Sequence, residues 1–292
     1  MIAKRNGLTC PLHKLQVLTW TLAALQTGGS YALIYPGLTE TTGVSFLCVF
    51  SLALGATLVL GILTTVSDPT DPVVYAHQAS IEKGLPFDER QYALVCTSCQ
   101  TNVSALSKHC AKCRRCIAHF DHHCKWLNNC IGGSNYRKFV ALLWAVECTE
   151  GVILAFGLVS LLEILSEVDM ARVVGIAVLL GTAVILFVIL LQLILFHIYL
   201  GLHGLTTYDY IRSRRAVSVR TKPTTDPIPP PFPSSFPSDF KPHAQMSSPA
   251  EYNLAAELRP VSDEDSPYSL SESILSGSQP PSRQLSSRNE LL

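Results

Sequence analysis

Eleven residues with metal-binding side chains crowd one short stretch of this chain. Seven of its ten cysteines and four of its nine histidines fall between residues 96 and 130. Cysteine pairs at CxxC spacing, followed by histidine and cysteine at finger-like intervals, favour tetrahedral Zn²⁺ held by thiolate sulfur and imidazole nitrogen. Two closed sites need eight ligands, so three candidates are left over from the set Cys96, Cys99, Cys110, Cys113, Cys116, Cys124, Cys130, His109, His119, His122 and His123.

The surplus ligands lie beside a carboxylate in the run Asp121-His122-His123-Cys124. A thiol left free next to imidazole and carboxylate can be activated as a nucleophile. In an extended chain His123 can turn toward a metal while His122 and Cys124 share the other face. A turn at Asp121 would let its carboxylate orient His122, as in a Cys-His-Asp triad. A purely structural zinc module with spare ligands would show the same spacing.

Long apolar runs flank this segment and predict an all-α integral membrane protein with four transmembrane helices. Each run meets the length of about 20 residues that a helix needs to cross the hydrocarbon core. The Cys/His segment then forms a loop between the second and third spans. The spans are expected at Leu15–Tyr35, Val44–Val66, Phe139–Leu162 and Val173–Leu200.

Lysine and arginine predict how the spans are oriented. The N-terminus, the Cys/His loop and the segment after the fourth span are basic, whereas only Arg172 lies between spans three and four. The positive-inside rule therefore places both termini and the loop in the cytosol. Thiols stay reduced there, which argues against a disulfide framework. The balance of 22 basic and 22 acidic residues gives no support to nucleic-acid binding.

These observations predict five segments along the chain. They are a cytosolic N-terminus (1–14), spans one and two (15–66), a cytosolic loop (67–138) with a cysteine-rich core at 94–138, spans three and four (139–211), and a tail (212–292). The tail is rich in proline and serine and is expected to be disordered. Its run Pro227–Pro237 could bind SH3-like partners, although a plain solvated tail is the simpler interpretation.

Two carboxylates interrupt the third span. Glu147 and Glu150 lie three residues apart and therefore on one helix face. Acidic residues inside a membrane are functional candidates by default. The simpler interpretation is a protonated or hydrogen-bonded pair that faces the bundle interior, near His197 or Gln192.

The stretch from Cys96 to Asn135, with the run FDHHCKWLNNCIGGSNY that ends one residue later at Tyr136, resembles the DHHC cysteine-rich domain of protein S-acyltransferases (palmitoyltransferases). The four-span frame extends the resemblance to about Ile211. The resemblance implies Cys124 as the nucleophile, His122 as its base and Asp121 as the group that orients the base. His119 is left without a role. Two structural Zn²⁺ are implied, one on Cys96, Cys99, His109 and Cys116 and the other on Cys110, Cys113, His123 and Cys130.

The activity implied is transfer of a long-chain acyl group, such as palmitoyl, from acyl-CoA to cytosolic cysteines of membrane-associated proteins. The lipid bilayer would be the other partner, and an endomembrane (endoplasmic reticulum or Golgi) the location. A catalytically weak membrane scaffold that keeps the fold and binds through its tail is the alternative. A transporter built around Glu147 and Glu150 is less favoured, because the four spans show no repeat.

Three single positions depart from the family pattern, and a fourth departure is the run Val103-Ser104-Ala105-Leu106, where members usually have basic and proline residues before His109. Lys125 stands where most members have proline, which resembles the branch of types one and eleven. Asp68-Pro69 resembles the family's DPG element with Thr70 in place of glycine, and the family's TTxE glutamate is Asp209 here. None of these changes removes an implied metal ligand or triad residue.

Overall fold

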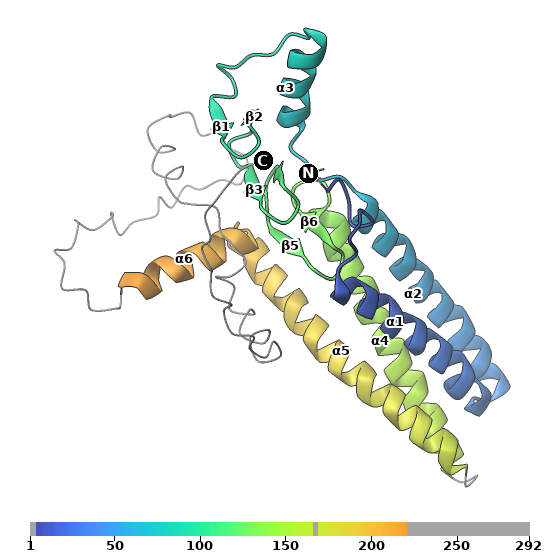
Figure 1. The fold of residues 1–292 in the computed structure, drawn as a ribbon. Coiled ribbons are helices and arrows are strands. Elements are labelled where there is room, and N and C mark those ends of the chain that lie inside the picture. The colour runs from blue at the N-terminus through green and yellow to red at the C-terminus, as the bar shows by residue number, and fades with distance from the viewer. Residues whose placement is uncertain (1–3, 166–168, 221–292) are drawn as a thin grey trace, which may run out of the picture. The chain divides into compact units, whose positions relative to one another are not determined.

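The computed structural model describes residues 4–165 and 169–220 (Figure 1). These residues are mostly helical, as predicted, but the Cys/His segment forms β-hairpins, which the all-α expectation left out. The helices are α1 (Lys14–Gly29), which continues through a π-helical turn (Ser30–Ile34) and a 3-10 turn (Tyr35–Gly37), then α2 (Glu40–Val66), α3 (Pro72–Lys83), α4 (Tyr136–Ile164), α5 (Met170–Leu202) and α6 (Thr207–Arg220). The strands are β1 (Leu94–Cys96), β2 (Thr101–Val103), β3 (Lys108–Cys110), β4 (Arg115–Ile117), β5 (His122–Cys124) and β6 (Asn129–Ile131).

Helix α6 occupies the start of the segment that was predicted to be a disordered tail. It runs from Thr207 to Arg220, so residues 212–220 are helical rather than disordered. The proline-rich run at 227–237 and the rest of the tail lie outside the described residues.

Three of the described helices are long and apolar enough to cross a bilayer, namely α2, α4 and α5. They cover the second, third and fourth predicted spans and extend slightly beyond them. The first predicted span, Leu15–Tyr35, is divided between α1 and the two irregular turns that follow it. These long apolar helices fit a membrane protein.

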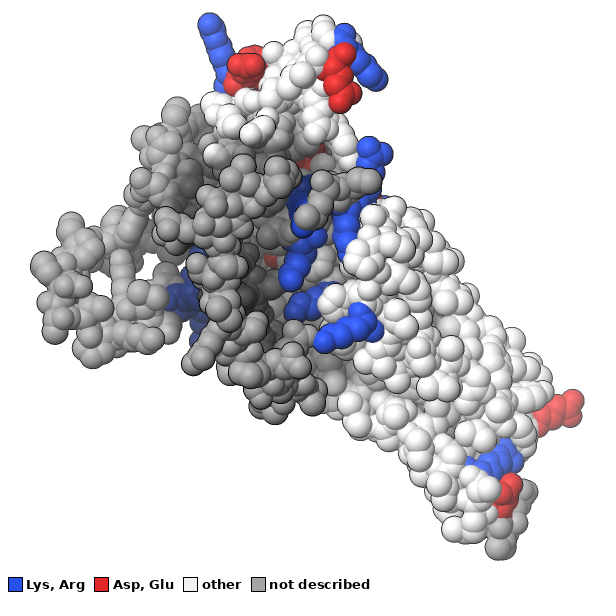
Figure 2. Space-filling view, viewed as in Figure 1, with Lys and Arg blue, Asp and Glu red and all other residues white. Residues whose placement is uncertain are grey.

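Helix α4 packs against both α2 and α5 (Figure 1). A buried cluster joins these helices to the π-helical turn and consists of Ile34, Phe46, Phe50, Ile153, Leu179 and Ala183. Apolar side chains also remain exposed on the outer faces, among them Leu52 and Ile185. Figure 2 shows that the flank of the helices is largely uncharged, with Lys and Arg gathered near the hairpins. Such a surface suits contact with lipid.

Polar side chains from α4 and α5 hold the irregular end of α1. Ser160 donates to the carbonyl oxygen of Ile34 at 3.0 Å, and Arg172 Nε donates to that of Leu33 at 3.0 Å. A Cβ on Gly37 would lie 2.3 Å from Ser160 Oγ, so only glycine fits beside these donors. Backbone carbonyls that leave the regular helical pattern need such partners where water is excluded.

The three hairpins repeat one another at a constant interval. β1, β3 and β5 begin at residues 94, 108 and 122, a spacing of 14, and each pairs antiparallel with the strand that follows it. The turn of each hairpin holds one residue in the left-handed region, with φ near +52° at Gln100, Arg114 and Asn128. The repeat therefore extends from the sequence to the backbone conformation.

The N-terminal segment packs onto the turn of the third hairpin, which joins β5 to β6. Lys4 Nζ donates to Asn128 Oδ1 at 2.9 Å, and Asn128 Nδ2 donates to the carbonyl of Gly7 at 3.2 Å. Gln16 of α1 donates to the same carbonyl at 2.9 Å, and the amide of Gly7 donates to the carbonyl of Thr65 at 2.8 Å. These bonds tie the third hairpin to the ends of α1 and α2.

Substitution of Gly7 by alanine should loosen this attachment. A Cβ there would lie 2.1 Å from the carbonyl oxygen of Leu127, so the third hairpin would have to shift. Overpacking of this kind costs about 1–3 kcal/mol. Thermal unfolding of the full chain in detergent should show a lower midpoint for Gly7→Ala. Gly28→Ala is the matched control, because no atom outside its own helix lies within 4 Å of the added Cβ. Equal midpoints for the two variants would show that the attachment carries no stability.

Candidate active site and metal centres

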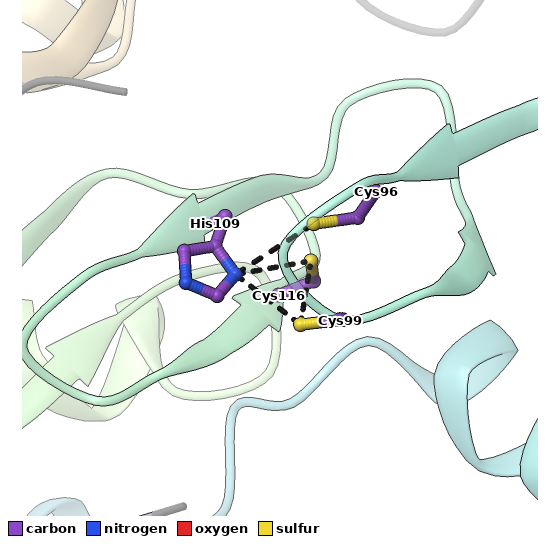
Figure 3. Close-up of side chains that lie close together, drawn as sticks. All are labelled: Cys96, Cys99, His109 and Cys116. Carbon is purple, nitrogen blue, oxygen red and sulfur yellow. Dashed lines mark hydrogen bonds between the residues drawn. The ribbon is translucent and has the colours of Figure 1, made fainter. Parts of the chain in front are cut away.

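Four side chains from the first two hairpins converge on one point (Figure 3). The Nδ1 atom of His109 lies 3.7, 3.2 and 3.8 Å from the sulfurs of Cys96, Cys99 and Cys116. The sulfurs of Cys116 and Cys99 are 3.6 Å apart. The structure thus brings together the first set of four that the family resemblance implies.

The second and third hairpins form an equivalent cluster. The Nδ1 atom of His123 lies 3.8, 3.4 and 3.5 Å from the sulfurs of Cys110, Cys113 and Cys130. Three of these four residues are buried, and Cys130 is fully so. In each cluster the four ligand atoms lie within 4.8 Å of one another.

Both clusters have the dimensions of a tetrahedral zinc site. Zn–S bonds of about 2.3 Å and Zn–N bonds of about 2.0–2.1 Å place ligand atoms roughly 3.4–3.8 Å apart. Five of the six sulfur–nitrogen separations lie in this range, at 3.4–3.8 Å, and the sixth, between Cys99 and His109, is 3.2 Å. Three thiolates and one imidazole form a donor set typical of structural zinc. The residues present therefore fit the metal.

Neighbouring sulfurs stabilise thiolates in both clusters. A hydrogen bond from Cys116 lowers the pKa of Cys99 to about 5, and the pKa of Cys116 rises in return. In the second cluster hydrogen bonds from Cys110 and Cys130 lower the pKa of Cys113 to about 3. Thiolate is the form that binds a metal, so the lowered pKa values in each cluster favour the binding of a cation.

Strand register explains why histidine and cysteine meet in each cluster. His109 is the direct cross-strand partner of Cys116, and His123 is that of Cys130. Side chains of directly opposite residues lie on the same face of a hairpin. The CxxC pair of the preceding hairpin completes each set. In the first hairpin the register position of the histidine is Val95, so that hairpin contributes only its two cysteines.

Cys124 occupies the position of a metal ligand in the third hairpin but belongs to neither cluster. It follows Cys96 and Cys110 at the same 14-residue interval, whereas Leu127 stands at the interval of Cys99 and Cys113. The Cys124 side chain is 7% exposed and packs in a cluster with Ile131, Phe139, Leu143 and Ile194. A free thiol is thus placed where the hairpins meet α4 and α5.

His122 links Cys124 to a buried carboxylate. Its Nδ1 atom lies 2.6 Å from Asp121 Oδ2. Burial lowers the pKa of His122, but its interactions with Asp121 and the Cys124 thiol outweigh this and raise the pKa to about 9. His123 faces the second cluster, so the two histidines point to opposite faces of β5. This arrangement allows His122 to take the proton of Cys124 while Asp121 holds the ring.

The start of α6 holds Asp121 in place. Thr207 donates to Asp121 from its backbone amide at 2.7 Å and from its hydroxyl at 3.0 Å. Asp121 is 3% exposed. Burial opposes ionisation, but the hydrogen bonds from His122 and Thr207 lower its pKa below the usual range. The carboxylate therefore stays charged and can stabilise a protonated His122.

The sequence predicts a turn at Asp121. In the structure a turn lies two residues earlier, where His119 adopts φ +48°. The side chain of His119 contacts Gly133, where an added Cβ would lie 3.2 Å from His119 Cβ. His119, which had no role in the sequence analysis, thus occupies a structural turn.

The departures at Thr70 and Asp209 are accommodated by local hydrogen bonds. The amide and hydroxyl of Thr70 donate to Asp68 Oδ1 at 3.0 and 2.6 Å. Arg115, which pairs with Asp68, also donates to the Thr70 hydroxyl at 2.8 Å. Asp209 Oδ2 accepts from the Thr206 hydroxyl at 2.7 Å in the first turn of α6. Thr70 therefore takes part in the junction between hairpins and helices, and Asp209 stabilises the first turn of α6.

Two residues of this junction were missed by the sequence analysis. Arg115 donates to Asn129 Oδ1 at 3.0 Å, and Asn129 Nδ2 donates to the carbonyls of Thr64, Thr65 and Ser67 at the end of α2. Arg115 and Asn129 occupy the same position of successive 14-residue repeats. That repeat was the signal that could have found them.

The carboxylates of α4 face the bundle interior, as the simpler interpretation predicted, but their partner is different. Gln26 of α1 donates to Glu150 Oε2 at 3.3 Å. His197, predicted to lie near them, instead meets Tyr136. Glu147 is 5% exposed, and among the described residues its carboxylate has no hydrogen-bond partner.

Comparison with known proteins adds an independent observation. Residues 89–214 match the family model described as DHHC palmitoyltransferase. A curated relative from Arabidopsis thaliana, "Probable protein S-acyltransferase 20", is 37% identical over 144 residues, which cover 43% of this chain and 20% of that protein. The match thus spans about a fifth of the relative's length. The matched region contains both metal clusters, Asp121, His122 and Cys124. Residues 89–214 are thus similar to the DHHC palmitoyltransferase family, and the similarity covers less than half of the chain.

Proposed function

We propose that this protein is a protein S-acyltransferase that moves a long-chain acyl group, such as palmitoyl, from acyl-CoA to cysteines of other proteins. The observation that carries the proposal is the linked set of Thr207, Asp121, His122 and Cys124, in which the thiol is excluded from both metal clusters. Cys124 is the nucleophile, His122 its base and Asp121 the group that orients the base. The family match at residues 89–214 supports the same chemistry.

The first step forms an acyl-enzyme. Cys124 gives its proton to His122, and the thiolate sulfur attacks the carbonyl carbon of the acyl-CoA thioester. The bond between that carbon and the CoA sulfur then breaks, and the CoA thiolate takes the proton from His122. One thioester replaces another, so catalysis depends mainly on thiolate activation and positioning rather than on driving force.

The second step returns the enzyme to its starting state. A thiol of the protein substrate gives its proton to His122 and attacks the acyl carbon on Cys124. The Cys124 sulfur leaves and regains the proton. Because Cys124 packs against side chains of α4 and α5, a fatty chain on its sulfur would enter the apolar bundle rather than water.

Two structural zinc ions would be held by the two Cys/His clusters. Cys96, Cys99, His109 and Cys116 form one, and Cys110, Cys113, His123 and Cys130 form the other. Bound zinc would supply folding free energy to short hairpins that lack a large apolar core. Four protein ligands leave no open coordination position at either ion.

The membrane arrangement we propose has four spans. Helix α1 and the two turns after it form one continuous helical segment from Lys14 to Gly37, long enough to serve as the first span beside α2, α4 and α5. The basic residues near the hairpins favour a cytosolic loop and cytosolic termini. Endoplasmic reticulum or Golgi membranes are the proposed location. The segments at 1–14, 15–66, 67–138, 139–211 and 212–292 correspond to this order.

Membrane-associated proteins with cytosolic cysteines are the proposed acyl acceptors. Proteins that bind the proline-rich tail are a second class of proposed partner. Lys125, beside the nucleophile, supports placement in the branch of types one and eleven. Its ammonium group would favour the Cys124 thiolate.

Replacement of Cys124 by serine should abolish self-acylation. Purified full-length protein incubated with labelled palmitoyl-CoA should carry a hydroxylamine-sensitive label, because the thioester is cleaved by that reagent. Cys124→Ser should carry none and should still bind about two zinc ions, since Cys124 is not a ligand. His122→Ala should slow labelling by roughly 10²–10⁴-fold.

Cys148→Ser is the matched control, because Cys148 is an exposed cysteine outside the site. Full labelling of Cys124→Ser would refute the assignment, and a wild type that binds partners without labelling would favour the scaffold.

Metal analysis should return about two zinc equivalents per chain. His109→Ala and His123→Ala should each lower the zinc content, and a chelator should unfold the hairpins, because metal binding and folding are coupled. His119→Ala should keep both ions, since His119 belongs to neither cluster. A folded, active protein without zinc would contradict the metal assignment.

Both termini should lie on the cytosolic side of the membrane. Epitope tags placed before residue 1 and after residue 292 should become accessible to antibody when the plasma membrane alone is permeabilised. A tag between α1 and α2 should become accessible only when the endomembrane is permeabilised as well, because one span separates it from the N-terminus. A lumenal tag at either terminus would overturn the four-span topology.

A further inference from the structure

A second histidine lies against the ring of His122. His197 of α5 is 5% exposed, and its ring centroid lies 6.1 Å from that of His122. Tyr136, the first residue of α4, places its hydroxyl 3.2 Å from His197 Nδ1. We propose that Tyr136 and His197 form a positioning pair, which sets the orientation of His122 toward Cys124. The inference rests on the proposed acyltransferase function.

The contacts form a closed set of aromatic rings. Phe139 meets His122 edge to face at 5.2 Å and 68°, and meets His197 at 5.2 Å and 74°. Tyr136 lies 5.8 Å from His197 and packs in the same cluster as Cys124. His122 therefore has two ring neighbours, one on α4 and one on α5.

Asp121 alone does not define the position of the His122 ring. One hydrogen bond at Nδ1 fixes the direction of that atom but leaves the ring free to tilt about it. A tilt moves the other nitrogen, Nε2, which must face the Cys124 sulfur. Ring contacts from Phe139 and His197 oppose the tilt. Small misplacements of reacting groups can lower a rate by about 10²-fold, so we expect this restraint on the ring to raise the rate of acyl transfer.

The pair also connects the third hairpin to α5. The amide of Tyr136 donates to the carbonyl of Gly132 at 2.9 Å, and Asn135 next to it donates to the carbonyl of Cys130 at 3.0 Å. Helix α4 thus begins, at Tyr136, close to the end of the third hairpin. The Tyr136 hydroxyl contacts His197 of α5. A hydrogen bond between two helices in an apolar surrounding gives one defined ring position for His197.

The chain offers a matched histidine and tyrosine outside the site. His203 and Tyr199 lie near the end of the same helix, with ring centroids 4.2 Å apart. Both are exposed, and among the described residues their rings contact each other and Tyr210 but not His122. Tyr199→Phe and His203→Phe remove the same groups as the test variants without touching the His122 ring.

The test measures self-acylation of the full chain in detergent across a range of palmitoyl-CoA concentrations. Tyr136→Phe and His197→Phe each remove the hydrogen bond and keep a ring. Each should slow labelling at saturation by roughly 3- to 10-fold, the effect of one ordinary hydrogen bond. The half-saturating concentration, the zinc content and the melting temperature should match those of the control variants. His197→Ala, which also removes the ring, should be slower by about 10²-fold.

A double variant separates positioning from general damage. Tyr136→Phe combined with His197→Phe should be no slower than the slower single variant, because both remove the same bond. Additive losses would overturn the proposal. So would a raised half-saturating concentration with an unchanged rate at saturation, or a loss of zinc that accounts for the lost activity. A wild type that labels while every variant labels equally would refute only this inference. A wild type that never labels would refute the acyltransferase itself.

Discussion

Each Cys/His cluster takes two cysteines from one hairpin and a histidine and a cysteine from the next, and the rest of the hairpin region depends on this staggered sharing. The middle hairpin supplies ligands to both clusters, so neither can form without fixing its neighbour. Hairpins of three-residue strands have almost no independent stability. The metal clusters therefore have to provide the free energy that hydrophobic packing provides in larger domains.

The staggered sharing also explains why a thiol that belongs to neither cluster lies in the last of the three hairpins. A third cluster would need ligands from a fourth hairpin, but the chain enters α4 at Tyr136 instead. Leu127 replaces the second cysteine of the pair, so Cys124 keeps the position of a ligand without partners for a metal. Hydrogen bonds then attach the same hairpin to three helices: Asn129 to the end of α2, Asp121 to Thr207 of α6, and Cys130 to Asn135 at the start of α4. The thiol is thus held by the scaffold that the two Cys/His clusters build, yet it belongs to neither cluster.

The parts of this arrangement that could be predicted from the sequence follow short-range rules. Alternation along an extended chain separates His122 from His123, and apolar runs identify α2, α4 and α5 as membrane-capable helices. The hairpins could not be predicted from β propensity, because the segment is rich in Cys, Lys, His and Asn rather than in β-branched residues. Metal ligation and positive φ at Gln100, Arg114 and Asn128 impose them. The 14-residue interval was visible, but its meaning depends on cross-strand register.

Contacts between distant segments lay beyond sequence reasoning for a different reason. The pairs between Lys4 and Asn128, between Asp121 and Thr207, and between Tyr136 and His197 join residues 124, 86 and 61 positions apart. Nothing local distinguishes these polar residues from others at helix ends. They matter because the hairpins and the apolar bundle depend on separate interactions, the two Cys/His clusters in one and helix packing in the other. The proposed nucleophile at their boundary, Cys124, keeps its geometry only if specific hydrogen bonds align the two parts. We therefore expect the Asp121–Thr207 and Tyr136–His197 pairs to affect the rate of the proposed reaction more than the stability of either part.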